Sequence, residues 1–173
     1  MEQVNPTRME LIQKRAQIKL AEQGRDLLRE KMDALIQEFF RIMGSVSRSR
    51  EELEGLAEDA YRALVIAQAV DDPVALRSVS FATRKQIVLD IGGKNIMGVP
   101  VPLIEKKRFA VPSLERGYSI LGVSGRIDET AERFESEIDL IIGLAETETA
   151  LRRLGHEIQM NRRRVNALEQ VLI

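Results

Sequence analysis

The sequence has no cysteine and no tryptophan, and aromatic residues make up only 4% of its 173 positions. Without cysteine there is no disulfide framework, no thiolate nucleophile and no cysteine-ligated metal, so a reducing compartment is expected. The single histidine, His156, excludes a histidine-rich metal site. So few aromatic side chains are unusual for a large globular core.

The chain also has almost no net charge, because 26 basic residues stand against 27 acidic ones. It therefore lacks the overall basic field that attracts nucleic acid or anionic lipid. Its apolar runs are far shorter than the roughly 20 residues of a membrane-spanning helix, and its polar N-terminus does not resemble a signal peptide. We expect a soluble intracellular protein that binds no nucleic acid and does not insert into the membrane.

What the sequence does contain is a long coiled-coil repeat. From Leu11 to Val70, alternating steps of three and four residues meet an apolar residue at 15 of 18 positions. This spacing keeps one side of a helix against a partner helix along a left-handed supercoil. Thr7 and Glu10 have the spacing of an N-terminal capping box, so we assign residues 1–70 to a long N-terminal coiled-coil helix.

A second repeat occupies residues 127–173 and is apolar at 12 of 14 seam positions. Two successive three-residue steps around Ile141 predict a local break in its phase. If the helices fold back on each other with Val70 opposite Ile127, the second helix ends near residue 24 of the first. The early seam of the first helix is then unpaired. Either another protein clasps it or the C-terminal helix is truncated, and we favour truncation.

The middle segment, residues 71–126, has a different pattern. Alternating branched residues predict a β-hairpin at about residues 85–104, with its turn at Gly92–Asn95. Pro100 and Pro102 lack amides on the same side of the second strand, which places that side outside the β-ladder. A return loop then leads to the second helix. The predicted fold class is mainly α: a long antiparallel two-helix coiled coil with a small β-hairpin and a return loop at the bend.

No constellation of residues points to catalysis. Arg153 stands where a di-iron helical bundle needs a carboxylate three residues before its histidine. The string Gly92–Asn95 lacks the spacing of a phosphate-binding loop. We therefore expect no catalytic residue, no cofactor and no metal site, and we look for function on the surface of the rod.

Two clusters are candidates for partner contact, and each has a simpler explanation that stays open. Phe39 and Phe40 widen the apolar stripe beyond what a two-stranded coil needs, which indicates either a further partner or cover by the middle segment. Arg162, Arg163 and Arg164 form the densest basic run. This run is either a docking collar for an acidic surface or a set of solvated side chains.

Three stretches carry a resemblance to a known family. They are Val4–Arg8 (VNPTR), Asn95–Glu105 (NIMGVPVPLIE) and Arg163–Gln170 (RRVNALEQ). Together with the order of the heptads and the hairpin, they make the chain resemble the D subunit of the archaeal and vacuolar-type rotary ATPases over essentially its whole length. The last stretch is fairly specific, whereas the first alone is weak.

The resemblance implies a non-catalytic rotor shaft that couples ATP turnover to ion translocation through a membrane ring. It implies that the paired terminal helices reach into a head of A and B subunits, that the other end sits on the C subunit, and that the F subunit binds alongside the coil. The chain is then cytoplasmic and peripheral to the membrane. Candidates for contact with the head become Arg8, Lys14 and Arg15 together with the arginine run, and Phe39 and Phe40 become candidates for contact with the F subunit.

A second hypothesis belongs to another class of protein. A cytosolic coiled-coil scaffold or adaptor without a rotary role needs the same straight seam. The hairpin and the return loop favour the rotor, because a passive spacer has no use for them.

Overall fold

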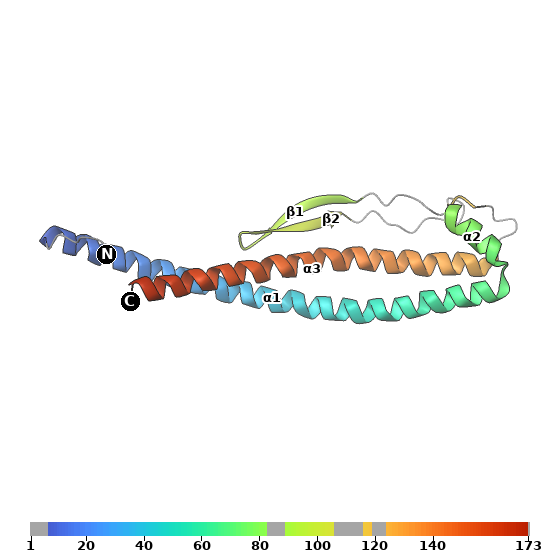
Figure 1. Ribbon diagram of the computed structural model, residues 1–173, viewed down its shortest axis with the longest axis horizontal. Helices are drawn as coiled ribbons and strands as arrows, with labels where there is room; N and C mark the ends of the chain where they lie inside the picture. Colours follow the sequence, from blue (N-terminus) through green and yellow to red (C-terminus); the bar gives the residue numbers. More distant parts are fainter. Residues whose placement is uncertain (1–6, 83–88, 106–115, 119–123, 173) are drawn as a thin grey trace.

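The computed structural model describes residues 7–82, 89–105, 116–118 and 124–172. Two long helices, α1 and α3, lie side by side in opposite directions and form a rod, with a two-stranded hairpin along it (Figure 1). The elements follow the chain in the order α1 (Arg8–Val70), α2 (Pro73–Ala82), β1 (Asp90–Ile96), β2 (Val99–Glu105) and α3 (Gly125–Leu172). The predicted fold class is confirmed.

Helix α1 runs without interruption over 63 residues, as the heptads predict. Its N-terminus is capped by Thr7, whose hydroxyl oxygen accepts a hydrogen bond from the backbone amide of Glu10 at 3.3 Å. At the other end, Asp71 has an extended backbone and donates its amide to the carbonyl of Ala67. At 1.5 Å per residue, α1 is about 95 Å long, and this helix sets the length of the rod.

An apolar seam holds the two long helices together. Leu35 and Ala60 of α1 and Leu154 of α3 are fully buried in it, and burial of a large aliphatic side chain is worth about 1.5–3 kcal/mol. The antiparallel register that the sequence predicts is visible in ion pairs between the helices. These pairs join Arg29 to Glu169, Arg50 to Glu148, and Arg133 to Asp59.

One position in the predicted seam of α3 is wrong. Ile141 is 43% exposed, whereas Ile142 and Leu144 are both buried. The latter two side chains point about 160° apart around the helix, on nearly opposite sides. Helix α3 is therefore covered on more than one side at this level, which a repeat written for a single partner helix does not predict.

The hairpin is present, but its turn lies further along the chain than predicted. With β1 and β2 paired antiparallel, the turn consists of Met97 and Gly98, whose φ angles of 52° and 88° are both positive. Two positive φ angles are typical of a type I′ hairpin turn, and glycine adopts them without steric cost. The stretch Gly92–Asn95, expected to turn, belongs to β1 instead. Residues 85–88 of the predicted first strand lie outside the described residues.

The hairpin packs along the middle of the rod, with its turn directed towards the end that carries the N-terminus of α1 (Figure 1). Val99 and Val101 of β2 are buried in the same apolar cluster as Leu35 of α1 and Leu154 of α3. The hairpin thus shares the core of the coil, which provides the support that two isolated strands lack.

Side chains of α3 bind the outer edge of β2. Arg153 donates a hydrogen bond to the carbonyl of Pro100 at 2.7 Å, and Glu146 accepts one from the amide of Ile104 at 3.1 Å. Because Pro100, Pro102 and Ile104 are alternate residues, their backbone groups face the same side of the strand. The edge of β2 on which Pro100 and Pro102 lack an N–H group therefore faces away from β1, as predicted. Helix α3 covers this edge.

The sequence pattern did not indicate α2. Its N-cap is Asp72, whose carboxylate accepts a hydrogen bond from the amide of Val74 at 3.1 Å. Pro73 follows as the first helical residue, a position where the missing amide of proline costs nothing. From the sequence, Asp72 and Pro73 are expected only to end the first helix. In the structure they also start α2.

A polar residue is buried deep in the apolar seam. Asn161 is fully buried, and among the described residues neither its Oδ1 nor its Nδ2 has a hydrogen-bond partner. A buried amide without partners costs about 1–3 kcal/mol, although a single such residue also fixes the register of a coiled coil. The seam is therefore weakened at this point.

Replacing Asn161 with Leu should stabilise the protein by about 1–2 kcal/mol, because the change removes an unsatisfied amide and adds apolar contact. Urea unfolding followed by circular dichroism measures the difference. The matched control is Asn166→Leu, the same exchange at an exposed position of α3, which should change stability by less than about 0.5 kcal/mol. A loss of stability in the Asn161 variant would contradict the account.

Candidate partner-binding surfaces

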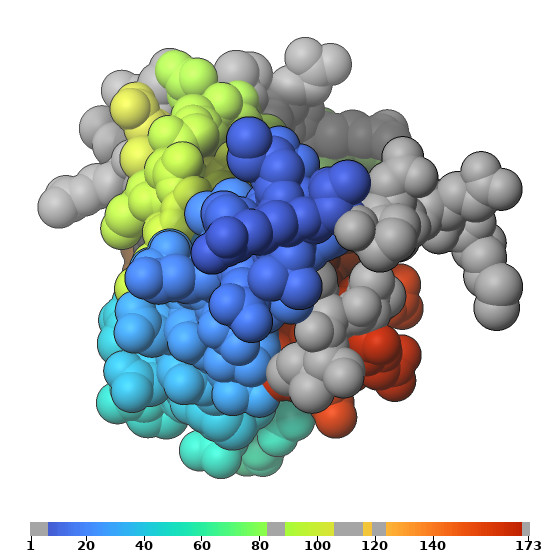
Figure 2. Space-filling view, turned by 90° about the vertical axis from the view of Figure 1, so that its left-hand side faces the viewer, coloured from blue at the N-terminus to red at the C-terminus, as the bar shows by residue number. Residues whose placement is uncertain are grey.

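The predicted basic contact residues form two groups near the same end of the rod. Arg8, Lys14 and Arg15 are exposed on the part of α1 that extends beyond α3 (Figure 1). Figure 2 looks along the rod from that end, with this part of α1 foremost and the hairpin to one side. The same stretch exposes the apolar side chains of Met9, Leu11, Ile12 and Leu20.

The second basic group is the run Arg162, Arg163 and Arg164 near the C-terminal end of α3, and all three side chains are exposed. Glu157, which precedes them on α3, forms an ion pair with Lys31 of α1 at 3.4 Å. Within the described residues the three arginines form no ion pair, so their charge faces outward.

The two phenylalanines divide between the core and the surface. Phe39 is half-buried and packs against the apolar cluster of the rod, whereas Phe40 is 59% exposed. Their rings meet edge to face with 6.0 Å between centroids. Phe39 therefore contributes to internal packing, and Phe40, together with the exposed Met43, forms an outer apolar surface.

A groove that the sequence did not reveal lies between α1 and α3 beside Phe39. Its volume is about 500 Å³, and we call it the interhelix groove. Gly155 of α3 forms part of its wall, and a Cβ atom built on this glycine lies 3.5 Å from Cε2 of Phe39. The only sequence signal for the groove is a glycine within a helical segment. The other lining residues are Arg50, Glu148, Leu151, Arg152, His156 and Gln159.

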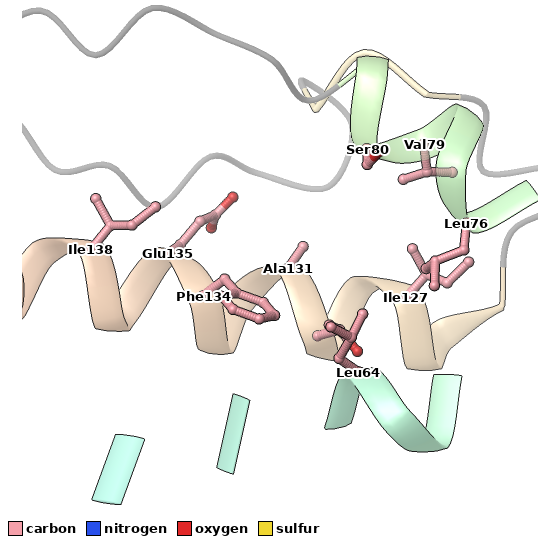
Figure 3. A pocket seen from close by; sticks show the side chains of 10 residues that line it. Leu64, Leu76, Val79, Ser80, Ile127, Ala131, Phe134, Glu135 and Ile138 are labelled. Atoms are coloured by element: carbon pink, nitrogen blue, oxygen red, sulfur yellow. The ribbon is translucent and has the colours of Figure 1, made fainter. Parts of the chain in front are cut away.

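A second groove, of about 320 Å³, lies at the bend where α2 approaches the start of α3 (Figure 3). We call it the bend groove. Apolar side chains from three helices line it, among them Leu64 of α1, Leu76 of α2 and Phe134 of α3. Val74 and Phe81 of α2 are also exposed, so the bend end of the rod carries a large apolar surface.

Arg116 fastens the middle segment to the start of α3. Its side chain is only 3% exposed, and its guanidinium lies 3.1 Å from a carboxylate oxygen of Asp128 and 3.2 Å from one of Glu135. Burial by itself lowers the pKa of Arg116, but hydrogen bonds with Glu135 and Tyr118 outweigh it and raise the pKa above its ordinary value. Burial and a hydrogen bond to Asp128 likewise raise the pKa of Tyr118.

Charge is distributed unevenly along the two long helices, although the net charge of the whole chain is close to zero. At the end far from the bend, residues 8–48 carry nine basic and six acidic side chains, and residues 150–172 carry five and two. Towards the bend, residues 49–70 carry two basic and five acidic side chains, and residues 125–149 carry two and eight. Because the helices are antiparallel, segments of like charge lie beside each other. The pair of helices is thus basic at one end and acidic at the other.

These features define a class of protein, an elongated coiled-coil stalk that presents its surfaces to other proteins. Across the described part of the chain, no cluster of three or more His, Cys, Asp or Glu residues could hold a metal ion. No helix among the same residues is long and apolar enough to cross a membrane.

The sequence matches the family model for the D subunit of ATP synthase over residues 10–173. The chain is 42% identical to the D subunit of the A-type ATP synthase of Thermococcus kodakarensis and 44% identical to that of Pyrococcus furiosus, in each case over 98% of the chain and 79% of the relative. The corresponding protein of Methanosarcina acetivorans is 43% identical over 96% of the chain and 79% of its own length.

The chain therefore belongs to the family of ATP synthase D subunits. It is a non-catalytic component of the central stalk of a rotary ATPase, and its partners lie within that membrane-associated complex. This membership decides in favour of the stalk component over an unrelated scaffold.

Replacing Arg116 with Met should destabilise the protein by about 2 kcal/mol, because the carboxylates of Asp128 and Glu135 lose their buried cation. Methionine retains the length of the apolar stem, so packing is largely kept. Urea unfolding measures the effect, with Arg126→Met at an exposed position of α3 as the matched control. Equal stabilities of the two variants would show that Arg116 does not fasten the segment.

Proposed function

We propose that the rod is the rotor shaft of the complex, with the extended end of α1 inside the head of A and B subunits and the bend directed towards the membrane ring. The observation that carries this proposal is the antiparallel seam between α1 and α3. It produces one slender body with two chemically different ends. A stiff body of this kind transmits rotation between distant sites with little loss of angle.

The mechanism that we propose is mechanical. An asymmetric rod presents different side chains to each of three nucleotide sites, so its angle determines which site is open. Nucleotide exchange in turn drives the rod, because a linkage between site affinity and rod angle is reciprocal. The asymmetry that supports this mechanism is the hairpin, which lies on one side of the rod (Figure 2).

For the head end, we propose contacts through both basic groups. Arg8, Lys14 and Arg15 would meet the head deepest in its bore, and the arginine run from Arg162 to Arg164 would meet it closer to the hairpin. These side chains are exposed, and basic residues are in excess at this end of the rod. A complementary bore would be lined with acidic side chains.

For the bend end, we propose contact with the C subunit. The support is the bend groove (Figure 3) and the exposed Val74 and Phe81 of α2 beside it. Apolar surface of this extent is typical of a protein interface. Through this contact the chain would be peripheral to the membrane, on its cytoplasmic face.

For the side of the rod, we propose that the F subunit binds at Phe40. This ring is largely exposed, lies edge to face on Phe39, and has the exposed Met43 close by on the same helix. Aromatic and methionine side chains are enriched at protein interfaces. Phe39 would support the interface from behind as part of the core.

Replacing Arg162, Arg163 and Arg164 with Gln should weaken association with a purified A and B subunit head about tenfold and reduce its dependence on salt, because three exposed charges are removed. Binding measured at several salt concentrations, together with the ATPase rate of the mixture, tests this expectation.

The control for that variant removes the same charge elsewhere, with Arg62, Arg77 and Arg126 replaced by Gln; all three are exposed and nearer the bend. Its affinity for the head should match the unaltered protein. Failure of the unaltered protein to associate with the head, even at low salt, would refute the rotor proposal.

Replacing Phe40 with Ala should lower affinity for the F subunit about tenfold without destabilising the rod, because this ring is mostly exposed before binding. Phe81→Ala is the matched control, since Phe81 is 60% exposed on α2. Titration calorimetry with the F subunit measures both. Unchanged affinity of the Phe40 variant would contradict the proposed contact and show that the two phenylalanines serve only internal packing.

A further inference from the structure

Gly155 has no evident role in the internal structure of the rod. It lies in the middle of α3, where a glycine costs about 1 kcal/mol relative to alanine. Its φ is not positive, since the described positive-φ glycines are Gly98 and Gly117. The nearest heavy atom to a Cβ built on it is Cε2 of Phe39 at 3.5 Å, an ordinary van der Waals distance. Neither backbone conformation nor helix packing therefore requires glycine at this position.

Because Gly155 has no side chain, the interhelix groove stays open. The groove is bounded on α1 by the ring of Phe39 and on α3 by Leu151, with Gly155 between them. On α3 the groove-lining positions 148, 152, 155 and 159 follow one stripe of the helix. The residues that bind the hairpin, Glu146 and Arg153, lie on a different stripe. The hairpin therefore leaves this groove accessible.

The charges of the groove indicate what it accepts. Arg50 is already paired with Glu148 across the groove. Arg152, by contrast, is exposed and forms no ion pair within the part of the chain that the structure describes. An unpaired guanidinium at the rim of this groove favours a partner that carries a carboxylate, and guanidinium binds carboxylate in a bidentate geometry.

The surface beside the groove indicates the size of the occupant. Phe40 lies edge to face on Phe39, and Met43 is exposed one turn along α1. All the lining residues are at least partly exposed, so the groove is a surface depression without the buried converging polar groups of a small-molecule site. Within it, Phe39, Leu151 and Gly155 form an apolar strip that charged and polar side chains flank. This mixed lining and the outer apolar border fit an amphipathic helix.

We propose that the interhelix groove is the seat of a helix from the F subunit, with one large apolar side chain over Gly155 and a carboxylate about one turn away on Arg152. This inference rests on the proposed binding of the F subunit and specifies its chemistry. Glycine at position 155 then selects the partner, because any side chain there occupies the space that the partner needs.

The test compares glycine substitutions inside and outside the groove. Gly155→Leu should lower affinity for purified F subunit at least about tenfold, because the new side chain fills the seat. Gly155→Ala should lower it to a smaller extent and slightly raise the melting temperature, because alanine favours the helix. The matched controls are Gly55→Leu and Gly55→Ala in α1, where a built Cβ has no neighbour within 4 Å. Both should bind the F subunit within about twofold of the unaltered protein.

The charge is tested separately with Arg152→Gln. This variant should bind the F subunit more weakly, and its affinity should depend less on salt than that of the unaltered protein. Arg126→Gln, an exposed arginine outside the groove, serves as the control. Equal salt dependence of the two variants would overturn the assigned carboxylate contact.

The outcomes separate this inference from the rotor proposal. Normal affinity of Gly155→Leu and Gly155→Ala for the F subunit would overturn the seat and leave the rotor standing. Normal assembly of Gly155→Leu with the A and B subunit head, combined with loss of F-subunit binding, supports the inference. No binding of the F subunit by the unaltered protein would overturn both the seat and the proposed Phe40 contact. Melting temperatures show that each variant is folded, and Gly155→Ala retains the test if the leucine variant is not.

Discussion

The antiparallel seam between α1 and α3 is the interaction on which the rest of the structure depends. Leu35 and Leu154 are completely buried in it, and the hairpin reaches the same core through the buried Val99 and Val101 and the partly buried Ile96. Without the seam, neither the hairpin nor the interhelix groove has a surface to form on. The seam also determines which segments of the chain become neighbours, and so it determines the surfaces that partners meet.

The antiparallel arrangement creates the polarity of the rod. The acidic last third of α1, residues 49–70, lies beside the acidic first half of α3, and the basic remainders of both helices lie together at the other end. Like charges in proximity repel one another and do not favour folding. In the orientation that we propose, this arrangement is understandable, because a rod with two distinct ends would distinguish the head from the membrane side during assembly.

The long helices and their pairing could be predicted because each turn of a paired helix needs an apolar residue on the side that faces its partner. This need recurs along the sequence as the heptad pattern. The turn of the hairpin could not, since Gly92–Asn95 has the composition of a turn, yet Met97 and Gly98 adopt the positive φ angles. The contact candidates were only partly resolved by sequence, which identified exposed arginines but did not separate Phe39 from Phe40. The interhelix groove and the clamp of Arg116 depend on side chains brought together from distant segments, and no local pattern encodes them.

The central claim is the antiparallel register, and the absence of cysteine allows a direct test with spin labels on introduced cysteines. Double electron–electron resonance should give short distances for labels at positions 29 and 169, and also at 50 and 148, because both pairs face each other across the seam. Labels at 29 and 148 should lie about 30 Å apart, the rise of roughly 21 helical residues. Long distances for the two facing pairs would contradict the account.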